Sequence, residues 1–217
     1  PERGLKATAV LPVKRFAAAK QRLAAGIDEE RRTALVAAML RDVLAAIGEA
    51  RSIERTIVVT SDREAEQLAR AGGAETVPDP DRGGHSGAAL AGIARARELG
   101  AECALLLPGD CPLLEARELE RLLTGIPASY VAIVPDHHGT GTNALALAPP
   151  DAIRPAFGEG SCARHLAAAR EAGVPFAVER LDSLALDLDT PADVVALTRE
   201  LEIGRGRARQ TAKALGI

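Results

Sequence analysis

Aromatic side chains are scarce in this sequence. Only 2% of the 217 residues are Phe, Trp or Tyr, and there is no Trp at all. Proteins that bind single-stranded nucleic acid stack the bases on aromatic side chains, so this composition argues against a site of that kind. The net charge of −3 also lacks the basic excess of a nucleic-acid-binding face. We therefore expect no nucleic acid among the partners.

Membrane-spanning and secretory signals are also missing. No apolar run approaches the ~20 residues that span a bilayer, and no signal peptide precedes the first expected strand. The three cysteines, Cys103, Cys111 and Cys162, have no metal-ligand spacing, so we expect reduced thiols. These features predict a cytoplasmic domain that acts on small molecules and has no membrane partner.

Two common nucleotide-binding motifs are absent or out of context. The phosphate loop GxxxxGK[ST] does not occur. The stretch GTGTNA matches the loose dinucleotide fingerprint, but it precedes a strand-like run, whereas the fingerprint must open a helix. Phosphate-loop nucleotidases and nicotinamide enzymes are therefore disfavoured.

Strand-length apolar runs alternate with segments of helical periodicity. We expect strands at 8–13, 56–60, 75–79, 103–107 and 130–135, and helices at 29–47 (capped by Asp28), 62–72, 86–99 and 115–123. This alternation, with short connections, predicts an α/β fold: a single-domain, mostly parallel, Rossmann-like sheet sandwiched by helices. Such a sheet binds ligands at the carboxyl ends of its strands.

The pattern changes after Pro135. A strand-like run at 143–148, a helix from near Ser161, strand candidates at 176–181 and 184–188, a helix from Pro191 to about Glu202 and a basic helix over 204–217 follow. We see no linker, and we expect one domain over 1–217. Its first half would be about 8–135, and the elements of about 136–190 would form hairpin-like insertions over the sheet's edge.

Three carboxylates stand at the ends of expected strands. Asp110 follows the strand at 103–107, and Asp187 and Asp189 lie at the end of the candidate at 184–188. Residues two apart on a strand share a face, so Asp187 and Asp189 would meet Asp110 if the two strands are neighbours. Converging carboxylates need a cation, and oxygen ligands select Mg²⁺, with Mn²⁺ as the alternative, over zinc. The competing interpretation is that Asp110 and Asp189 cap the helices that follow them.

The loop that leaves the first strand is basic. It contains Lys14, Arg15, Lys20 and Arg22 within PVKRFAAAKQRL. Beside a metal site, such a loop would hold a triphosphate, with lysines as point charges and arginines as planar donors. The alternative is a solvated basic turn.

The stretch FGEGSCARH predicts a second anion site. Its glycines let backbone N–H groups turn inward, and Ser161 could cap a helix whose N-terminus favours anions. Arg164 and His165 lie in the first turn, where a cation is poorly placed unless an anion is bound. The hydroxyl groups of Thr140 and Thr142 in GTGTN would add donors. The alternative is a plain loop with a surface arginine.

Three other residues are expected to be structural. Cys111 has no basic neighbour in sequence and is predicted to pack as a small hydrophobic residue. His137 and His138 are predicted to be a solvated pair, because a metal site would need more ligands.

Together these motifs resemble the CofC/FbiD guanylyltransferases of coenzyme F-420 biosynthesis, over nearly the whole chain. PVKRFAAAKQRL resembles the family's N-terminal loop, PGDCPLL and LDLDTPADV its metal aspartates, and GTGTNAL with FGEGSCARH its phosphoacid pocket. The last two motifs are the most specific. The resemblance implies a GT-A-like nucleotidyltransferase fold, with nucleotide binding in the first half and phosphoacid binding and metal ligands in 136–190. It also implies Mg²⁺-dependent transfer of GMP from GTP to phosphoenolpyruvate or 2-phospho-L-lactate, with release of pyrophosphate.

The resemblance also implies roles for individual residues. Asp110, Asp187 and Asp189 would hold Mg²⁺ and would form the catalytic set together with Lys20. The family's phosphoacid contacts would fall on Thr142, Gly158 and Ser161. Arg164 and His165, in the first turn of the expected helix, join them in the expected phosphoacid site. The basic loop gives Lys14, Lys20 and Arg22 as the expected nucleotide-binding residues, together with Ser86. Where relatives usually read GLNAAL this chain has GGHSGAAL, so His85 and Ser86 replace Leu and Asn in the region expected to contact the nucleotide.

Other functions share part of this pattern. Molybdenum-cofactor-type nucleotidyltransferases would have the acids but not the GTGTN and SCARH pocket. Glycosyltransferases of this fold use paired aspartates, but the Lys-containing first loop disfavours them. A non-catalytic nucleotide-binding protein would be expected to have lost a metal acid, and all three are present. The choice among phosphoenolpyruvate, 2-phospholactate and 3-phosphoglycerate stays open, as does the oligomeric state.

Overall fold

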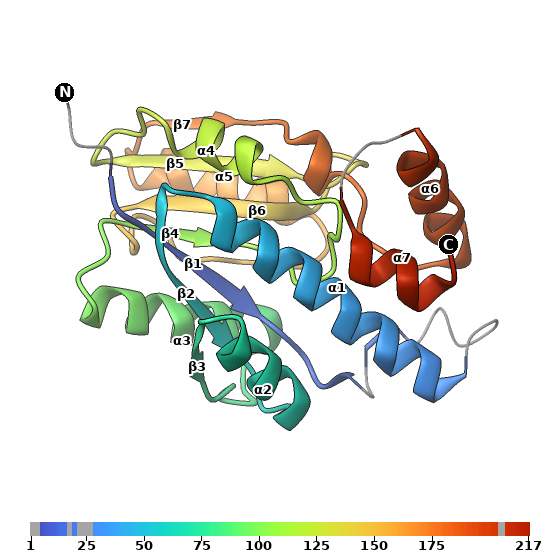
Figure 1. The fold of residues 1–217 in the computed structure, drawn as a ribbon. Helices are drawn as coiled ribbons and strands as arrows, with labels where there is room; N and C mark the ends of the chain where they lie inside the picture. The colour runs from blue at the N-terminus through green and yellow to red at the C-terminus, as the bar shows by residue number, and fades with distance from the viewer. Residues whose placement is uncertain (1–4, 17–18, 21–27, 204–206) are drawn as a thin grey trace.

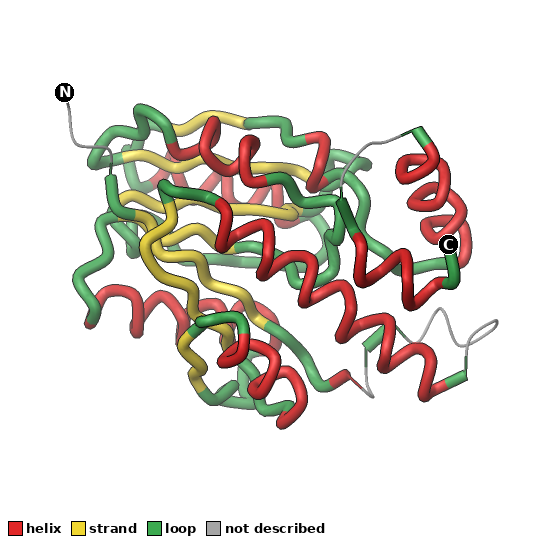
Figure 2. The backbone as a smooth tube through the Cα atoms, viewed as in Figure 1, coloured by secondary structure: helices red, strands yellow, loops and turns green. Residues whose placement is uncertain are grey.

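The computed structural model describes residues 5–16, 19–20, 28–203 and 207–217. One seven-stranded sheet, in the order β3-β2-β1-β4-β6-β5-β7, forms the middle layer, and helices cover both of its faces (Figures 1 and 2). The strands are β1 (Ala7–Pro12), β2 (Ile53–Val59), β3 (Glu75–Val77), β4 (Cys103–Leu106), β5 (Tyr130–Pro135), β6 (Thr142–Ala148) and β7 (Phe176–Val178).

The helices lie in two layers. One core cluster joins the sheet to α1, α2, α4, α6 and α7, and the other joins it to α3 and α5. Among the described residues, no helix is long and apolar enough to cross a membrane. The helices are α1 (Glu29–Glu49), α2 (Arg63–Ala71), α3 (Gly84–Glu98), α4 (Ala116–Leu123), α5 (Ser161–Glu171), α6 (Pro191–Glu202) and α7 (Arg209–Leu215), with a 3₁₀ turn at Asp182–Leu184.

The apolar run of β1 places it at the centre of the sheet. All six of its residues are buried, with Ala9 and Leu11 in one core cluster and Val10 in the other. A strand that is buried on both faces reads as a continuous apolar run, as parallel strands of α/β proteins do. β1 is parallel to both β2 and β4, and β2 is parallel to β3, so the predicted mostly parallel α/β sheet is confirmed.

Two predictions about the second half are wrong. β6 does not lie over the sheet's edge, because it is inserted between β4 and β5 and runs antiparallel to both. In this position, with a strand on each side, the apolar run at 144–148 is fully buried. The candidate at 184–188 is not a strand. Its alternating pattern arises because Leu184 and Leu188 are both anchored in the core, without any sheet partner.

Two glycines with opposite surroundings give a test of the packing. A Cβ at Gly92 of α3 would lie 2.3 Å from Cγ1 of Val10 and 3.0 Å from Cγ2 of Val59, whereas a Cβ at Gly48 of α1 would meet nothing within 4 Å. We expect Gly92→Ala to lower the free energy of unfolding by about 1–3 kcal/mol through overpacking. Gly48→Ala, the matched control, should raise it by about 0.5–1 kcal/mol, because alanine favours the helix. Urea unfolding measures both, and equal effects of the two changes would contradict the described helix packing.

Candidate active site

Asp110 lies just beyond the carboxyl end of a central strand. β1 and β4 are parallel and adjacent, so the chain leaves both of them at the same edge of the sheet. The N–H of Leu107 still donates to the carbonyl of Val10, at 3.0 Å, before Pro108 and Gly109 turn the chain away. Asp110 therefore lies beside the loop that follows β1.

A second segment brings two more carboxylates to this edge. The N–H of Leu188 donates to the carbonyl oxygen of Asp110 at 3.4 Å, and the Leu188 side chain is fully buried. Asp187 and Asp189 are its two neighbours in sequence. The side-chain amide of Asn143 also holds this segment, by donating to the carbonyl of Leu184 at 2.6 Å. The buried side chain of Leu188 thus holds Asp187 and Asp189 near Asp110, a proximity that we had predicted from a strand.

Neither Asp110 nor Asp189 caps a helix. The N-cap of α6 is Thr190, which forms a capping box with Asp193. The N-cap residue of α4 is Glu115, and its side chain makes no capping hydrogen bond. The capping interpretation is therefore wrong for both acids, and their placement requires another explanation.

Lys20 joins two of the three acids. Its Nζ lies 2.5 Å from Oδ2 of Asp110 and 2.5 Å from Oδ1 of Asp189, and its side chain is only 7% exposed. Burial opposes the charge, but the two carboxylates outweigh it and raise the pKa of Lys20. The pKa of Asp187 is raised too, by burial and by the charges of Asp110 and Asp189. Lys20 also has a positive φ of 55°, which is uncommon for a residue with a side chain.

The donor set suits a hard cation. Across the described residues, no three His, Cys, Asp or Glu side chains are close enough to hold a metal ion together. The ammonium of Lys20 lies between Asp110 and Asp189 and shows that this pair of carboxylates can hold a cation. Carboxylate oxygens are the ligands that Mg²⁺ prefers, so this pair of carboxylates fits such an ion if Lys20 moves aside.

The sequence did not indicate that His137 belongs beside the acids. Its Nδ1 lies 4.0 Å from Oδ1 of Asp187, and its ring packs on that of His138, with 3.7 Å between ring centres. The His137 side chain is about half exposed. The exposure of both rings confirms the predicted solvated pair. The contact with Asp187 was missed because no local motif shows that the turn after β5 lies against the segment before α6.

The two motifs of the predicted anion pocket meet in the structure. The N–H of Cys162, in the first turn of α5, donates to the carbonyl of Thr140 at 3.1 Å. Gly158 and Gly160 have φ values of 104° and 70°, which favour glycine. Gly160 is the N-cap residue of α5, so the predicted cap by Ser161 is wrong. Instead the Ser161 hydroxyl is buried and has no hydrogen-bond partner within the described parts of the chain.

Asp136 shapes the GTGTN turn. Its carboxylate accepts hydrogen bonds from the N–H groups of Thr140 and Gly141, both at 3.0 Å. A Cβ at Gly141 would lie 2.5 Å from Oδ2 of Asp136, so a larger residue there would force this carboxylate to shift. We did not single out Asp136 in the sequence, although an aspartate at the start of a glycine-containing turn is the usual signal for this arrangement.

Arg164 and His165 support the loop before α5. The guanidinium of Arg164 donates to the carbonyls of Ala156, Phe157 and Glu159, at 2.5 to 3.1 Å. These carbonyl oxygens are partners for the positive charge of Arg164, so a bound anion is not needed to explain a cation in the first turns of α5. His165 is fully buried, so its side chain is not open to direct contact with a ligand. The other predicted phosphoacid residues are Thr142, Gly158 and Ser161.

The predicted nucleotide residues have different places. Ser86, at the start of α3, accepts a hydrogen bond from the N–H of Phe157 at 2.9 Å, and the His85 ring packs edge-to-face on Phe157, with 4.8 Å between ring centres. This segment therefore contacts the loop before α5. Lys14 is exposed in the loop after β1, and Arg22 lies outside the described residues.

The burial of His165 predicts a pH dependence of stability. Burial, with a smaller effect of Arg164, lowers the pKa of His165 from 6.5 to about 4. Between these values the unfolded chain binds more protons than the folded one, so stability falls as the pH drops through this window, by up to about 3 kcal/mol. Urea unfolding at pH 7.5 and 4.5 should show this loss in the wild type and a smaller one in His165→Gln. The carboxylates titrate in both proteins, so equal losses would contradict the prediction.

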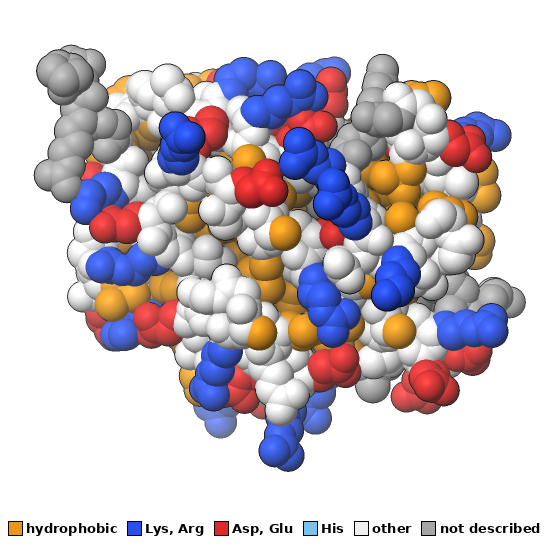
Figure 3. Space-filling view, viewed as in Figure 1, with side chains coloured by type: hydrophobic (Ala, Val, Ile, Leu, Met, Phe, Trp, Pro, Cys, Tyr) orange, Lys and Arg blue, Asp and Glu red, His pale blue; other side chains and the backbone are white. Residues whose placement is uncertain are grey.

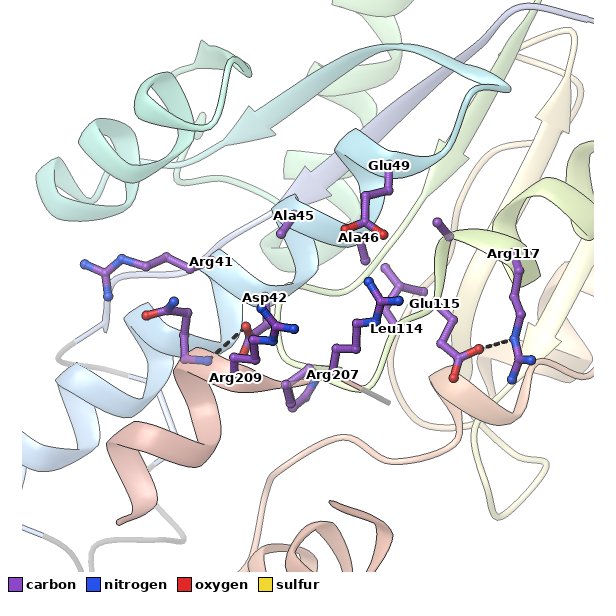
Figure 4. Close-up of a pocket in the computed structure, with 14 residues that line it drawn as sticks. Arg41, Asp42, Ala45, Ala46, Glu49, Leu114, Glu115, Arg117, Arg207 and Arg209 are labelled. Carbon is purple, nitrogen blue, oxygen red and sulfur yellow. Dashed lines mark hydrogen bonds and ion pairs between the residues drawn. The ribbon is translucent and has the colours of Figure 1, made fainter. Parts of the chain in front are cut away.

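A separate cavity of about 700 Å³ lies between α1, the start of α4 and α7 (Figure 4). Asp42 of α1 closes one side by accepting from the N–H groups of Gln210 and Thr211. Basic and acidic side chains are interspersed over this face of the molecule (Figure 3). The charged side chains that line the cavity are Arg41, Asp42, Glu49, Glu115, Arg117, Arg207 and Arg209. None of the three converging acids lines it, so we assign it no part in the active site.

Solved proteins with a similar architecture include nucleotidyltransferases. A putative nucleotide-diphospho-sugar transferase from Desulfovibrio desulfuricans superimposes with a TM-score of 0.76 at 14% identity, over 95% of this chain and 94% of that one. This similarity supports the fold. The predicted nucleotidyltransferase type of α/β fold is confirmed.

Closer relatives are found by sequence. Phosphoenolpyruvate guanylyltransferase of Conexibacter woesei is 46% identical over 94% of this chain and 92% of its own length. 3-phospho-D-glycerate guanylyltransferase of Phenylobacterium zucineum is 38% identical, over 96% and 95%. The family model described as "Guanylyl transferase CofC like" matches residues 7–210. The resemblance seen in the motifs is therefore confirmed, and the chain belongs to the CofC-like guanylyl transferase family of nucleotidyltransferases.

Proposed function

We propose that this protein transfers the guanylyl group of GTP to phosphoenolpyruvate, with Mg²⁺ and with release of pyrophosphate, in coenzyme F-420 biosynthesis. The observation that carries the proposal is the contact of two neighbouring residues of β6 with two different sites. Thr142 contacts His165 behind the anion pocket, and Asn143 holds the segment that bears Asp187 and Asp189. A phosphoacid in the pocket would thus lie next to a nucleotide at the acids.

The reaction needs no general base. A phosphate oxygen of the acid attacks the α-phosphorus of GTP, the bond from that phosphorus to the β-phosphate oxygen breaks, and pyrophosphate leaves with the bonding electrons. A phosphomonoester has its second pKa near 6, so the nucleophile is already anionic at neutral pH. Burial raises the pKa of the Cys111 thiol well above its usual value, which agrees with a packing role.

Two anionic reactants must be held together against their repulsion. Lys20 and Lys14 provide positive charge for the triphosphate, and the hydroxyls of Thr142 and Ser161 provide donors for the acid. Mg²⁺ bound by Asp110, Asp187 and Asp189 would neutralise the charge that develops on the leaving pyrophosphate. Lys20 would release the carboxylates and bind phosphate oxygens instead.

A second acceptor is favoured by one observation. The relative from Phenylobacterium zucineum is named for 3-phospho-D-glycerate and covers 96% of this chain. The relative named for phosphoenolpyruvate is more similar, at 46% identity, and we therefore put phosphoenolpyruvate first.

The test is a matrix of substrates scored by pyrophosphate release. GTP, ATP, CTP and UTP are each combined with phosphoenolpyruvate, 2-phospho-L-lactate and 3-phosphoglycerate, with Mg²⁺ and with acid-free controls. We expect the highest rate with GTP and phosphoenolpyruvate. Reaction with ATP or CTP alone would contradict the guanylyl assignment. Reaction with 3-phosphoglycerate alone would show that this acid, and not phosphoenolpyruvate, is the acceptor. No release from any pair would contradict the proposed reaction.

A further inference from the structure

His165 lies behind the proposed phosphoacid pocket without access to it. Its side chain is 0% exposed, and it is four residues after Ser161 on α5. Residues four apart share one face of a helix, so His165 lies on the face that carries the unpartnered Ser161 hydroxyl. A buried polar ring of this kind must be matched by hydrogen bonds.

The hydrogen bonds of His165 determine which ring nitrogen carries the proton. The backbone N–H of Ala156 donates to Nε2 at 2.9 Å. A backbone amide cannot accept through its nitrogen, so Nε2 is unprotonated, and the neutral ring carries its proton on Nδ1. The low pKa of about 4 agrees with a neutral ring at physiological pH.

This tautomer determines the direction of one hydroxyl group. Nδ1 of His165 lies 3.0 Å from Oγ1 of Thr142, so the Nδ1–H donates and the Thr142 oxygen accepts. The hydroxyl proton of Thr142 then points away from the ring and needs another acceptor. Thr142 is half-buried at the start of β6, beside the pocket.

We infer that His165 is a positioning residue, which holds Thr142 as an obligatory donor to an anionic oxygen of the acid substrate. The inference rests on the proposed function, because it assigns the acid to this pocket. Thr142 and the unpartnered Ser161 hydroxyl would then present two donors to the same ligand. A pocket built of donors selects a carboxylate or phosphate oxygen.

Two substitutions separate the two hydrogen bonds of His165. The side-chain oxygen of glutamine reaches the position of Nε2, so His165→Gln keeps an acceptor for Ala156 and loses the donor to Thr142. The side-chain nitrogen of asparagine reaches the position of Nδ1, so His165→Asn keeps the donor and loses the acceptor. Thr142→Val removes the hydroxyl itself, and Thr142→Val with His165→Gln completes a double-mutant cycle.

The kinetic test uses GTP and phosphoenolpyruvate. We expect His165→Gln and Thr142→Val each to raise the KM for phosphoenolpyruvate about 10-fold, the effect of losing one hydrogen bond to a charged group, with little change in the KM for GTP. His165→Asn should stay within about 3-fold of the wild type, and His165→Gln should have no further effect in Thr142→Val. Independent, multiplying effects in the cycle would overturn the inference. So would an asparagine variant as impaired as the glutamine variant.

A spectroscopic test does not depend on turnover. Long-range ¹H–¹⁵N NMR spectra of protein labelled at its 4 histidines show which ring nitrogen is protonated. The signal set that disappears in His165→Asn belongs to His165, and we expect the Nδ1–H tautomer in it at pH 7. The Nε2–H tautomer would overturn the inference. If the tautomer is as expected but no phosphoacid reacts with GTP in the wild type, the proposed function fails while the hydrogen-bond assignment stands.

Discussion

Asp110→Asn is expected to lower the rate of pyrophosphate release about a thousand-fold or more. Asn keeps the size of the side chain but removes the charge at the point where β4 meets the segment of Asp187 and Asp189. The three acids would then lose part of the charge that holds the cation opposite the triphosphate. Release of pyrophosphate from GTP with phosphoenolpyruvate and Mg²⁺ measures the effect.

The matched control is Asp151→Asn. Asp151 is 49% exposed and pairs with Arg97 on the surface, where such a pair adds little stability. This variant should keep the wild-type rate and the wild-type unfolding midpoint. Near-normal turnover in Asp110→Asn, with both proteins folded, would contradict the assignment of Asp110 to the metal site.

Lys20→Met is expected to have the second-largest effect, on activity and on stability. Without the ammonium, Asp110 and Asp189 lose the cation that lies 2.5 Å from each of them. Breaking a buried ion pair costs about 3–5 kcal/mol, and the 33% and 44% exposure of the two acids reduces this to about 1–3 kcal/mol. Activity should fall about a hundred-fold, because the triphosphate loses a cation.

The measurement that identifies this mechanism is thermal unfolding with and without Mg²⁺. Mg²⁺ should stabilise Lys20→Met more than the wild type, because the ion no longer competes with the ammonium. Lys6→Met serves as the control, since Lys6 pairs with Glu54 at the surface, where each side chain is 41% exposed. An equal Mg²⁺ effect on all three proteins would contradict the role of Lys20 as the internal cation.

Local signals were enough to predict most helices and strands. The Asp28 cap and the apolar periodicity after it predicted α1, and Pro191 predicted the start of α6 at the observed residue. These features depend on hydrogen bonds and packing within a few residues. The class of protein was predicted in a different way, from the resemblance of motifs along the chain to those of a known family.

Long-range contacts were beyond the reach of the sequence. The candidate strand at 184–188 failed because alternation also arises when two leucines anchor an irregular segment. The pairing of Lys20 with Asp110 and Asp189 joins residues that are 90 and 169 positions apart. His165 looked like a ligand because it belongs to the motif, and its burial and its contact with Thr142 are visible only in the structure.

The central claim is direct transfer of a nucleotidyl group onto the phosphate of the acid. Such transfer joins two phosphorus atoms through one oxygen, so ³¹P NMR of a reaction with GTP, phosphoenolpyruvate and Mg²⁺ observes it directly. We predict two new, mutually coupled phosphorus signals that grow in step with free pyrophosphate. Pyrophosphate that accumulates with GMP, without a coupled pair, would show hydrolysis and would contradict the account.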